Sequence, residues 1–526
     1  MCSTIALGVL AFVALAYFLG PERAARVFGG CVRGVANLLA LFVRLCSELW
    51  RNSPGLRAAF RRPGARERVL SPGDAAPLPG QVGDHFDYRG VAVEREIAPL
   101  LQGGLRLGRY LRPSGQPGAN VYLPPEMLER NCAVIGPPGS GKTESVVIPW
   151  IEGILSSGAS AVTIDVKGDL ADRLSRSALQ MGARWWYWSI SDPARSMSWN
   201  WLDGVADERG RQAAVQSILG RPSPHDNQPF FHERDCRWLR ACIEIVKLVQ
   251  GPEAQPRSIY KLVASDAVMA AAFEHYPETR RLRPEVSDLV GLGADERSRA
   301  VSGLLNALHL FSSQEIRSVT ERSDFGLADI CSRPTLLVIG ASLADARASE
   351  VMSSIMISQL LAQVYRRFDA GGARTARPLY LIIDEAPRLK TRIDYAEVLS
   401  VARSARVGIC LAAQDVSQFG DEREASGILS NCLTFICLRG VSAETARYFS
   451  GRLGNRADVA VEQGVNRGPR ELVPGQHFGY QNVSLPVLDA RAIMHPPFDT
   501  YSGIVHVSPV SPKPFLVDLA FGCSHP

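Results

Sequence analysis

NCAVIGPPGSGKTESVVIP, residues 131–149, contains the phosphate-loop pattern G-x-x-x-x-G-K-[ST]. The fixed positions of this pattern are Gly136, Gly141, Lys142 and Thr143. The apolar residues before the loop predict a short buried strand, and the residues from Thr143 to Trp150 predict the first turns of a helix. Strand, glycine-rich loop and helix in this order are the context in which the pattern binds phosphate.

Each residue type in this loop has a chemical reason. Glycines let backbone N–H groups close around phosphate oxygens, and the N-terminus of the helix adds partial positive charge. Lys142 is expected to place its ammonium on the outer phosphates of ATP, and the hydroxyl of Thr143 is an expected Mg²⁺ ligand. The alternative is a chance glycine-rich turn. The predicted nucleotide-binding residues are Gly136, Pro137, Pro138, Gly139, Ser140, Gly141, Lys142, Thr143 and Glu144.

The apolar run LYLIIDEA, residues 379–386, leads into Asp384 and Glu385. In phosphate-loop ATPases, a carboxylate at the end of a buried strand holds Mg²⁺, and a nearby group orients the attacking water. Asp384 is therefore a predicted metal ligand together with Thr143, and Glu385 is the predicted activator of water. The alternative is that either carboxylate only caps a helix. Gln414 follows a predicted strand and is expected to contact the γ-phosphate or its water, or else to be a solvated loop residue. Lys142, Glu385 and Gln414 are the predicted catalytic residues.

Other apolar runs along the chain predict a repeating pattern of strands and helices. Strands are expected at 159–166, 335–339, 407–413, 433–438, 504–507 and 515–517, and a long helix at 348–368. This alternation indicates an α/β fold with a mostly parallel sheet covered by helices on both faces. The aromatic run Trp185–Trp188 favours another buried strand, with base stacking as the alternative.

The region from about Asp207 to Thr320 differs from its surroundings. Leu239, Ile243 and Val246 recur at helical spacing, and no convincing strand interrupts the segment. An all-helical insertion is therefore expected here.

The N-terminus has the composition of a membrane anchor. Residues 1–21 carry no charged side chain, and a run of this length is close to what a helix needs to cross a bilayer. Residues 27–50 form either a second span or a helix lying in the interface. Residues 1–70 hold ten Arg, three Glu, no Lys and no Asp, a net charge of +7, so the rest of the chain carries −2 of the total +5. Positive residues after a span favour the cytoplasmic side.

Cysteine and histidine show no pattern of a disulfide framework or a zinc site. The eleven Cys contain no C-x-x-C pair, and several lie in apolar runs. This use of cysteine is typical of reduced, buried thiols in a cytosolic body.

The ordered series of landmarks resembles the TraG-like coupling ATPases of type IV secretion and conjugative DNA transfer. The resemblance spans about residues 105–500. The matching pieces are GPPGSGKTESVVIP, VTIDVKGDL, HERDCRWLRACIEIV, SVTERSDFGLADI, LYLIIDEAPRL, GICLAAQDVSQF and NCLTFICLRGVSAETARYFSGRLG. It implies a RecA-like motor with an all-helical insertion and an N-terminal transmembrane helix or hairpin.

The resemblance also implies a function and partners. The protein is expected in the bacterial inner membrane, with its ATPase body in the cytoplasm and a homohexameric ring as its assembly. It would recruit DNA, relaxase-bound DNA or an effector protein, and drive that cargo to the channel built by other type IV secretion subunits. One alternative is an effector receptor that uses ATP as a switch. Another is a related DNA translocase, which would need more membrane spans and a DNA-reading C-terminal module.

Some residue roles follow only from this resemblance. The run DVKGDL resembles a family D-P-K-G-E segment beside the nucleotide, with Asp165 and Lys167 at matching positions. Val166 stands where the family has Pro, and Asp169 where it has Glu. Candidates for a trans-acting arginine finger are Arg403, Arg406 and Arg439.

The expected domain organisation has five parts. They are a membrane anchor (1–50), a basic Pro/Gly-rich linker (51–90), a first nucleotide-binding part (91–206), the helical insertion (207–320) and a second nucleotide-binding part (321–526). Because the insertion supplies more chain than a nucleotide-binding sheet needs, it is expected to read the cargo. The alternative is a buttress for the ring.

Overall fold

The computed structural model describes residues 88–222, 229–342, 344–369, 377–466, 475–496 and 501–522. The predicted membrane anchor and all but the last three residues of the predicted linker lie outside these ranges. Within the described ranges, no helix is both long and apolar enough to cross a bilayer.

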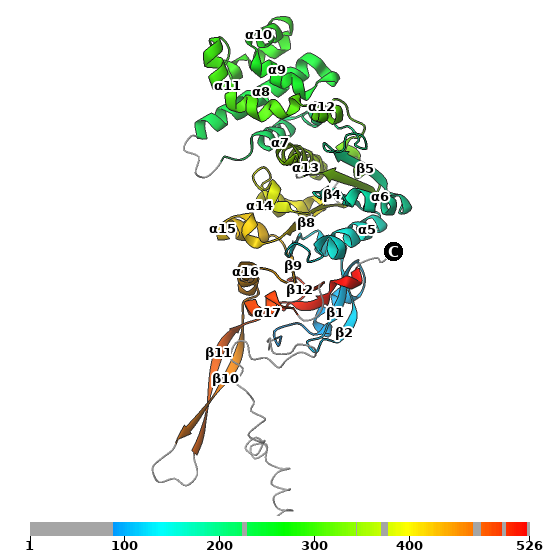
Figure 1. The fold of residues 1–526 in the computed structure, drawn as a ribbon, viewed down its shortest axis with the longest axis vertical. Helices are drawn as coiled ribbons and strands as arrows, with labels where there is room; N and C mark the ends of the chain where they lie inside the picture. Colours follow the sequence, from blue (N-terminus) through cyan, green and yellow to red (C-terminus); the bar gives the residue numbers. More distant parts are fainter. Residues whose placement is uncertain are drawn as a thin grey trace, which may run out of the picture. The chain divides into compact units, whose positions relative to one another are not determined.

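An eleven-stranded sheet organises most of the described chain (Figure 1). In spatial order, its parallel part is β9 (Thr434–Leu438), β3 (Cys132–Ile135), β8 (Val407–Ala413), β7 (Leu379–Ile383), β4 (Ser160–Asp165), β6 (Thr335–Gly340) and β5 (Arg184–Ser189). Every residue of these strands is buried except the first two of β5. Burial on both faces explains why the strands are continuous apolar runs. The predicted mostly parallel α/β fold is confirmed.

Four antiparallel strands extend the sheet beyond β9. They are β12 (Ser502–Val507), β13 (Phe515–Asp518), β1 (Leu105–Leu111) and β2 (Pro117–Leu123). The two C-terminal strands were expected from their apolar runs, but the hairpin of β1 and β2 was not. β2 reads PGANVYL, and most of its first residues are exposed, so it lacks the apolar run that marks the buried strands.

Alternate residues of the strands enter two separate cores, one on each face of the sheet. Ala133 and Ile135 of β3 join one core, and Cys132 and Val134 join the other. The helices α5 (Ile148–Ser156) and α6 (Leu170–Gln180) cover the second face. The first face is covered by α13 (Ala346–Asp369), α14 (Tyr395–Ala402), α15 (Glu422–Leu429) and α16 (Ala443–Leu453). Short helices α4 (Pro125–Leu128) and α17 (Ala490–Met494) complete this part.

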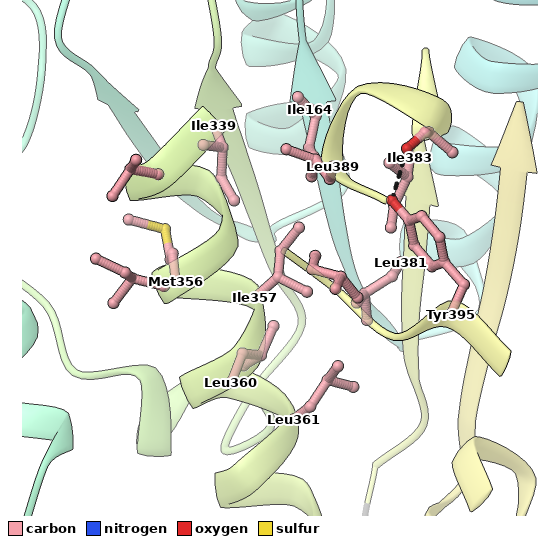
Figure 2. Close-up of a cluster of buried hydrophobic side chains, with 14 of the residues drawn as sticks. Ile164, Ile339, Met356, Ile357, Leu360, Leu361, Leu381, Ile383, Leu389 and Tyr395 are labelled. Carbon is pink, nitrogen blue, oxygen red and sulfur yellow. Dashed lines mark hydrogen bonds between the residues drawn. The ribbon is translucent and has the colours of Figure 1, made fainter. Parts of the chain in front are cut away.

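Figure 2 shows how α13 packs on the strands that lead to the predicted site. Met356, Ile357, Leu360 and Leu361 face the sheet residues Ile164, Ile339, Leu381 and Ile383, all of them buried. Burying one such side chain contributes about 1.5–3 kcal/mol. This core therefore gives a rigid base to the carboxyl ends of β4, β6 and β7.

The helix that follows the phosphate loop differs from the expected one. Thr143–Val147 is a π-helical turn, and the α-helix α5 begins only at Ile148. Pro149 has no N–H to donate to the Ser145 carbonyl, which removes one α-helical bond from this turn. Wide turns of this kind occur often at functional sites.

The described residues between 207 and 320 contain helices and no strand. The helices are α7 (Glu208–Leu219), α8 (Pro229–Gln250), α9 (Pro256–Ala264), α10 (Asp266–His275), α11 (Ala294–Leu308) and α12 (Gln314–Thr320). The first of them, α7, packs against α13 of the sheet layer, where Arg209 pairs with Asp369 at 2.7 Å and Asp207 pairs with Arg366 at 3.0 Å.

A buried arginine connects α11 to α9 and α10. Arg297 of α11 donates to the carbonyls of Leu262, Val263 and Leu289, and pairs with Asp266 at 3.0 Å. Its side chain is 5% exposed. The guanidinium thus binds the C-terminal end of α9, where free carbonyls favour positive charge, and pairs with Asp266 in the first turn of α10.

A second, two-stranded sheet pairs β10 (Asn455–Asn466) with β11 (Gly475–Pro486) in antiparallel register, with Asn455 opposite Pro486. The hairpin begins directly after α16, whose C-terminus is capped by Gly454 at φ 73°. Its mixed polar and apolar sequence did not predict it, because no continuous apolar run marks either strand.

A candidate nucleotide-binding and hydrolysis site

The phosphate loop is closed by glycines that no other residue can replace without strain. Gly139 and Gly141 have φ of 76° and 84°, in the left-handed region that glycine occupies freely. At Gly136 a Cβ would lie 2.6 Å from the Ser140 hydroxyl oxygen and 2.8 Å from Leu438. The N–H of Gly136 donates to the carbonyl of Ala413 at 3.1 Å, which ties the loop to the end of β8.

Lys142 lies inside this loop. Its Nζ donates to the carbonyls of Gly136 and Pro137 at 2.5 and 3.2 Å, and the residue is 7% exposed. Burial lowers the pKa of the Lys142 ammonium, while the carboxylates of Asp384 and Glu385 act in the opposite direction. A half-desolvated cation of this kind binds an anion more strongly than a solvated one does.

Thr143 and Asp384 meet although 241 residues separate them. The Thr143 hydroxyl donates to Oδ2 of Asp384 at 3.2 Å. Asp384 follows β7 and is 8% exposed. Burial and then Glu385 raise the pKa of this carboxyl, and Lys142, the Thr143 hydrogen bond and Lys167 lower it. A hydroxyl and a carboxylate side by side are two of the oxygen ligands that Mg²⁺ takes beside phosphates.

Glu385 and Gln414 form the second contact of the site. Nε2 of Gln414 donates to Oε1 of Glu385 at 2.9 Å. Glu385 adopts the left-handed conformation, with φ 56° and ψ 43°, which costs about 1–3 kcal/mol for a residue other than glycine. The next turn is held by Tyr395, whose hydroxyl donates to the Ala386 carbonyl at 2.9 Å (dashed in Figure 2).

The DVKGDL segment lies at the same edge of the sheet. β4 pairs in parallel with β7, and Ile164 is opposite Ile383, so Asp165 and Asp384 end neighbouring strands. The buried carboxylate of Asp165 accepts the N–H groups of Gly168 at 2.7 Å and Ala171 at 3.2 Å. Burial raises the pKa of Asp165, and these backbone donors oppose that effect.

Not every predicted site residue points into the candidate site. Pro138 and Gly139 are exposed at the loop tip, and Glu144 pairs with Arg173 of α6. Arg403 and Arg406 precede β8, at the edge of the sheet opposite the site, and Arg406 pairs with Glu129 at 3.5 Å.

The remaining predicted residues are Arg439 and the aromatic run Trp185–Trp188. Arg439 follows the carboxyl end of β9, beside the loop. Trp186 and Trp188 are buried in β5, where Trp186 stacks on Phe325 at 4.8 Å. The buried-strand interpretation of the aromatic run is therefore confirmed.

The residues present fit a nucleoside triphosphate with Mg²⁺. The Ser140 hydroxyl oxygen is buried inside the loop and has no hydrogen-bond partner in the described part of the chain. A phosphate oxygen held by this loop would supply one. The described residues contain no cluster of three or more His, Cys, Asp or Glu side chains suited to a metal ion. A site with one carboxylate and one hydroxyl suits Mg²⁺, which keeps several waters and binds through phosphates.

Residues 105–466 match the protein family described as type IV secretory system conjugative DNA transfer. The chain belongs to this family. The resemblance stated from the sequence motifs is thereby confirmed. No curated protein matches the chain.

The fold of this family member is similar to solved structures of a conjugative coupling protein. Bacterial conjugative coupling protein TrwBdeltaN70, in an unbound form, is 16% identical with a TM-score of 0.59, over 83% of this chain and 94% of that chain. Plasmid coupling protein TrwB in complex with the ATP analogue ADPNP is 16% identical with a TM-score of 0.61, over 87% and 98%. TrwB in complex with ADP and Mg²⁺ is 17% identical with a TM-score of 0.59, over 82% and 92%. At this identity the likeness shows a shared fold.

Sequence reasoning missed two residues of this site. The ring of Tyr501 lies against Gly141, where a Cβ would come within 2.3 Å of two ring carbons. Gln418 accepts the N–H of Gln414 at 3.0 Å through its side chain. The turn signal Asp415–Gln418 was available for the second contact, but no local pattern connects Tyr501 with a loop 360 positions earlier.

Proposed function

We propose that this chain is a membrane-anchored ATPase that couples cargo to a type IV secretion channel through ATP hydrolysis. The observation that carries this proposal is the meeting of Lys142, Thr143, Asp384, Glu385 and Gln414 at the carboxyl ends of β3, β7 and β8. This is the edge at which α/β sheets bind ligands.

Each residue has a distinct role in the proposed reaction. The loop N–H groups and Lys142 would bind the phosphates, and Thr143 and Asp384 would hold Mg²⁺. Mg²⁺, when bound, supplies neutralisation of charge on the transferring phosphoryl group. Gln414 donates a hydrogen bond to Oε1 of Glu385. The other carboxylate oxygen, Oε2, is therefore left to take a proton from the attacking water. The same bond orients the carboxylate.

The solved relatives give this proposal independent support. TrwB structures are described in complex with ADPNP, with the GTP analogue GDPNP, and with ADP and Mg²⁺. A chain of the same fold, with the phosphate loop described above, is expected to bind the same class of ligand.

Membrane anchoring, a homohexameric ring and cargo transport also belong to this proposal. The uncharged residues 1–21 and the Arg-rich residues that follow support an inner-membrane anchor with the ATPase body in the cytoplasm. Deleting residues 1–70 should therefore release the ATPase from the membrane fraction. A full-length chain that stays soluble without detergent would contradict the anchor.

One observation favours the receptor alternative for protein effectors. Residues 71–526 carry a net charge of −2, which argues against a uniformly DNA-binding surface, although a ring needs positive charge only along its pore.

The test of cargo class measures both DNA binding and ATP hydrolysis by the full-length chain. Both are measured with single-stranded and duplex DNA across a salt series. Stimulation and binding that weaken steeply with salt support a DNA motor, because phosphate contacts release counterions. ATP hydrolysis without any DNA binding at low salt would favour the effector receptor. Absence of hydrolysis under every condition would contradict the ATPase itself.

A further inference from the structure

The helical insertion contains an apolar pocket that the proposed nucleotide site does not use. The pocket has a volume of about 420 Å³ and lies between α8, α9 and α10, the helices in the upper part of Figure 1. Most of its wall is apolar, with contributions from Val246, Val249, Leu262 and Ala271. Two further lining residues, Val268 and Tyr276, are 45% and 37% exposed. Clustered exposed apolar side chains of this kind mark a surface at which another molecule docks.

A second apolar feature projects from the other end of α8. Phe230 and Phe231 are 67% and 45% exposed, and their rings meet edge to face with centroids 5.7 Å apart. The Arg234 guanidinium lies over the ring of Phe231 at 4.9 Å and over the buried ring of Trp238 at 4.4 Å. It also donates to the carbonyl of Ala300 at 2.9 Å. The aromatic pair is therefore supported from within the insertion and protrudes as a fixed group.

The aromatic pair and the pocket of one chain are too far apart to meet. Phe231 and Val246 lie on the same helix, whose rise of about 1.5 Å per residue separates them by about 22 Å. One copy thus carries an apolar anchor and an apolar pocket at opposite ends of a rigid element. A second copy supplies the complement of each. A contact between them is head-to-tail, and head-to-tail contacts generate rings when the rotation between copies closes.

The charges around these two features do not favour nucleic acid as the occupant. No Asp, Glu, Lys or Arg is among the described residues that line the pocket. Beside the aromatic pair, Arg234 pairs with Asp235 at 2.9 Å, and Arg237 pairs with Asp288 at 2.6 Å. Binding to a phosphate backbone needs cations that are free to replace counterions. Aromatic anchors that fill apolar pockets are instead typical of contacts between proteins.

We propose that Phe230 and Phe231 of one copy insert into the pocket between α8, α9 and α10 of the neighbouring copy, and so join adjacent insertions. This inference rests on the ring assembly that is part of the proposed function, and it names the surfaces that join the copies within the insertion. The contact contains no residue of the proposed nucleotide site. Nucleotide affinity should therefore not depend on it.

The experiment measures self-association of the full-length chain in detergent by sedimentation velocity across a concentration series. Phe230→Ser combined with Phe231→Ser should weaken association about tenfold or more, because the burial of two aromatic side chains is lost. Val268→Glu places a carboxylate at the pocket and should weaken association to a similar extent. Val401→Ser changes an apolar residue on α14 that is 42% exposed, and should leave association unchanged.

A mixture of the two kinds of variant tests the pairing of anchor and pocket. The double Phe variant keeps an intact pocket, and Val268→Glu keeps an intact aromatic pair. The two should therefore associate with each other more tightly than either does with itself, because only the mixed pair contains one complete contact. A fluorophore on one variant makes the mixed species visible. Absence of this preference would overturn the pairing.

The outcomes separate this inference from the proposed function. If the parent chain stays monomeric at every concentration, the proposed ring fails, and this contact fails with it. If the parent associates and both variants associate as tightly, the contact is overturned while the ring stands. Loss of DNA binding in the double Phe variant, with association unchanged, would assign the aromatic pair to nucleic acid instead. Unfolding midpoints equal to that of the parent show that folded chains are being compared.

Discussion

Gln414 donates an amide hydrogen to Glu385 at 2.9 Å, and the two residues follow the neighbouring strands β8 and β7. The contact holds the carboxylate that we assign to water activation. Gln414 is itself held by Gln418, so the orientation of Glu385 depends on the whole turn after β8.

Glu385→Gln should retain ATP binding and lose turnover by about 10²–10⁴-fold, because an amide cannot accept the proton of the attacking water. Steady-state hydrolysis and equilibrium binding of ATP check both parts. Glu397→Gln, an exposed change on α14, is the matched control and should hydrolyse ATP at the parental rate. Unchanged turnover in Glu385→Gln would sink the assignment of this residue.

Gln414→Ala should slow hydrolysis about tenfold while the affinity for ATP stays near that of the parent. The variant frees Oε1 of Glu385 and leaves the carboxylate less well oriented, but it removes no group from the phosphate loop. Single-turnover rates and nucleotide affinity measured on the same preparation test this split. A large loss of affinity with an unchanged rate would instead place Gln414 on the nucleotide.

Asp384→Asn should raise the thermal unfolding midpoint at pH 7.5 when neither Mg²⁺ nor nucleotide is present. Burial raises the pKa of Asp384 above its value in the unfolded chain, so ionisation of this carboxyl lowers stability as pH rises through the folded-state pKa. The asparagine removes that cost and can still accept the Thr143 hydrogen bond.

The same linkage gives the pH dependence of the difference. The gain of Asp384→Asn over the parent should shrink as pH falls, and vanish below the pKa of an ordinary aspartate, where both forms of the side chain are neutral. Scanning calorimetry across this pH range is the measurement. Equal midpoints at pH 7.5 would show that the ionised carboxylate is not disfavoured in the folded chain.

Arg297→Met should destabilise the helical insertion by about 2–4 kcal/mol, because the buried carbonyls that the guanidinium serves would lose their donors. Hydrogen exchange in α9 and α10 is the local readout, and it should accelerate. Arg299→Ala changes an exposed arginine on the same helix and should alter stability by less than about 0.5 kcal/mol. Parental exchange rates in Arg297→Met would show that the arginine does not anchor these helices.

Replacing residues 222–312 with a Gly/Ser linker tests whether the insertion reads the cargo. This cut keeps α7, which packs on α13, and α12, whose Val319 carbonyl accepts from the indole of Trp188 at 3.2 Å. We expect nucleotide binding to survive, and cargo pull-down and transfer to be lost. Persistent transfer of the native cargo would reduce the insertion to a buttress, and loss of nucleotide binding would assign it to the motor.

Local sequence was sufficient for the parts of this protein whose chemistry is contiguous. A phosphate loop needs its strand, glycines and helix in one short segment, so residues 131–149 predicted the loop directly. Strands buried on both faces must be apolar throughout, and for that reason most of the parallel strands were visible as runs. The hairpins β1–β2 and β10–β11 were not predicted, because none of their strands is a continuous apolar run; β1, although mostly buried, reads LRLGRYL, and β2 reads PGANVYL.

Only the tertiary structure brought the two halves of the site together. The buried strands are nearly equivalent as patterns, so nothing local states that β8 lies between β3 and β7. That order places Gln414 beside Glu385 and Thr143 beside Asp384. The same holds for Tyr501 on Gly141 and for Asp165, which ends β4 beside the strand that Asp384 follows. The sequence specifies the residue types at these positions. Their proximity results from the order of the strands, which the packing of both cores selects.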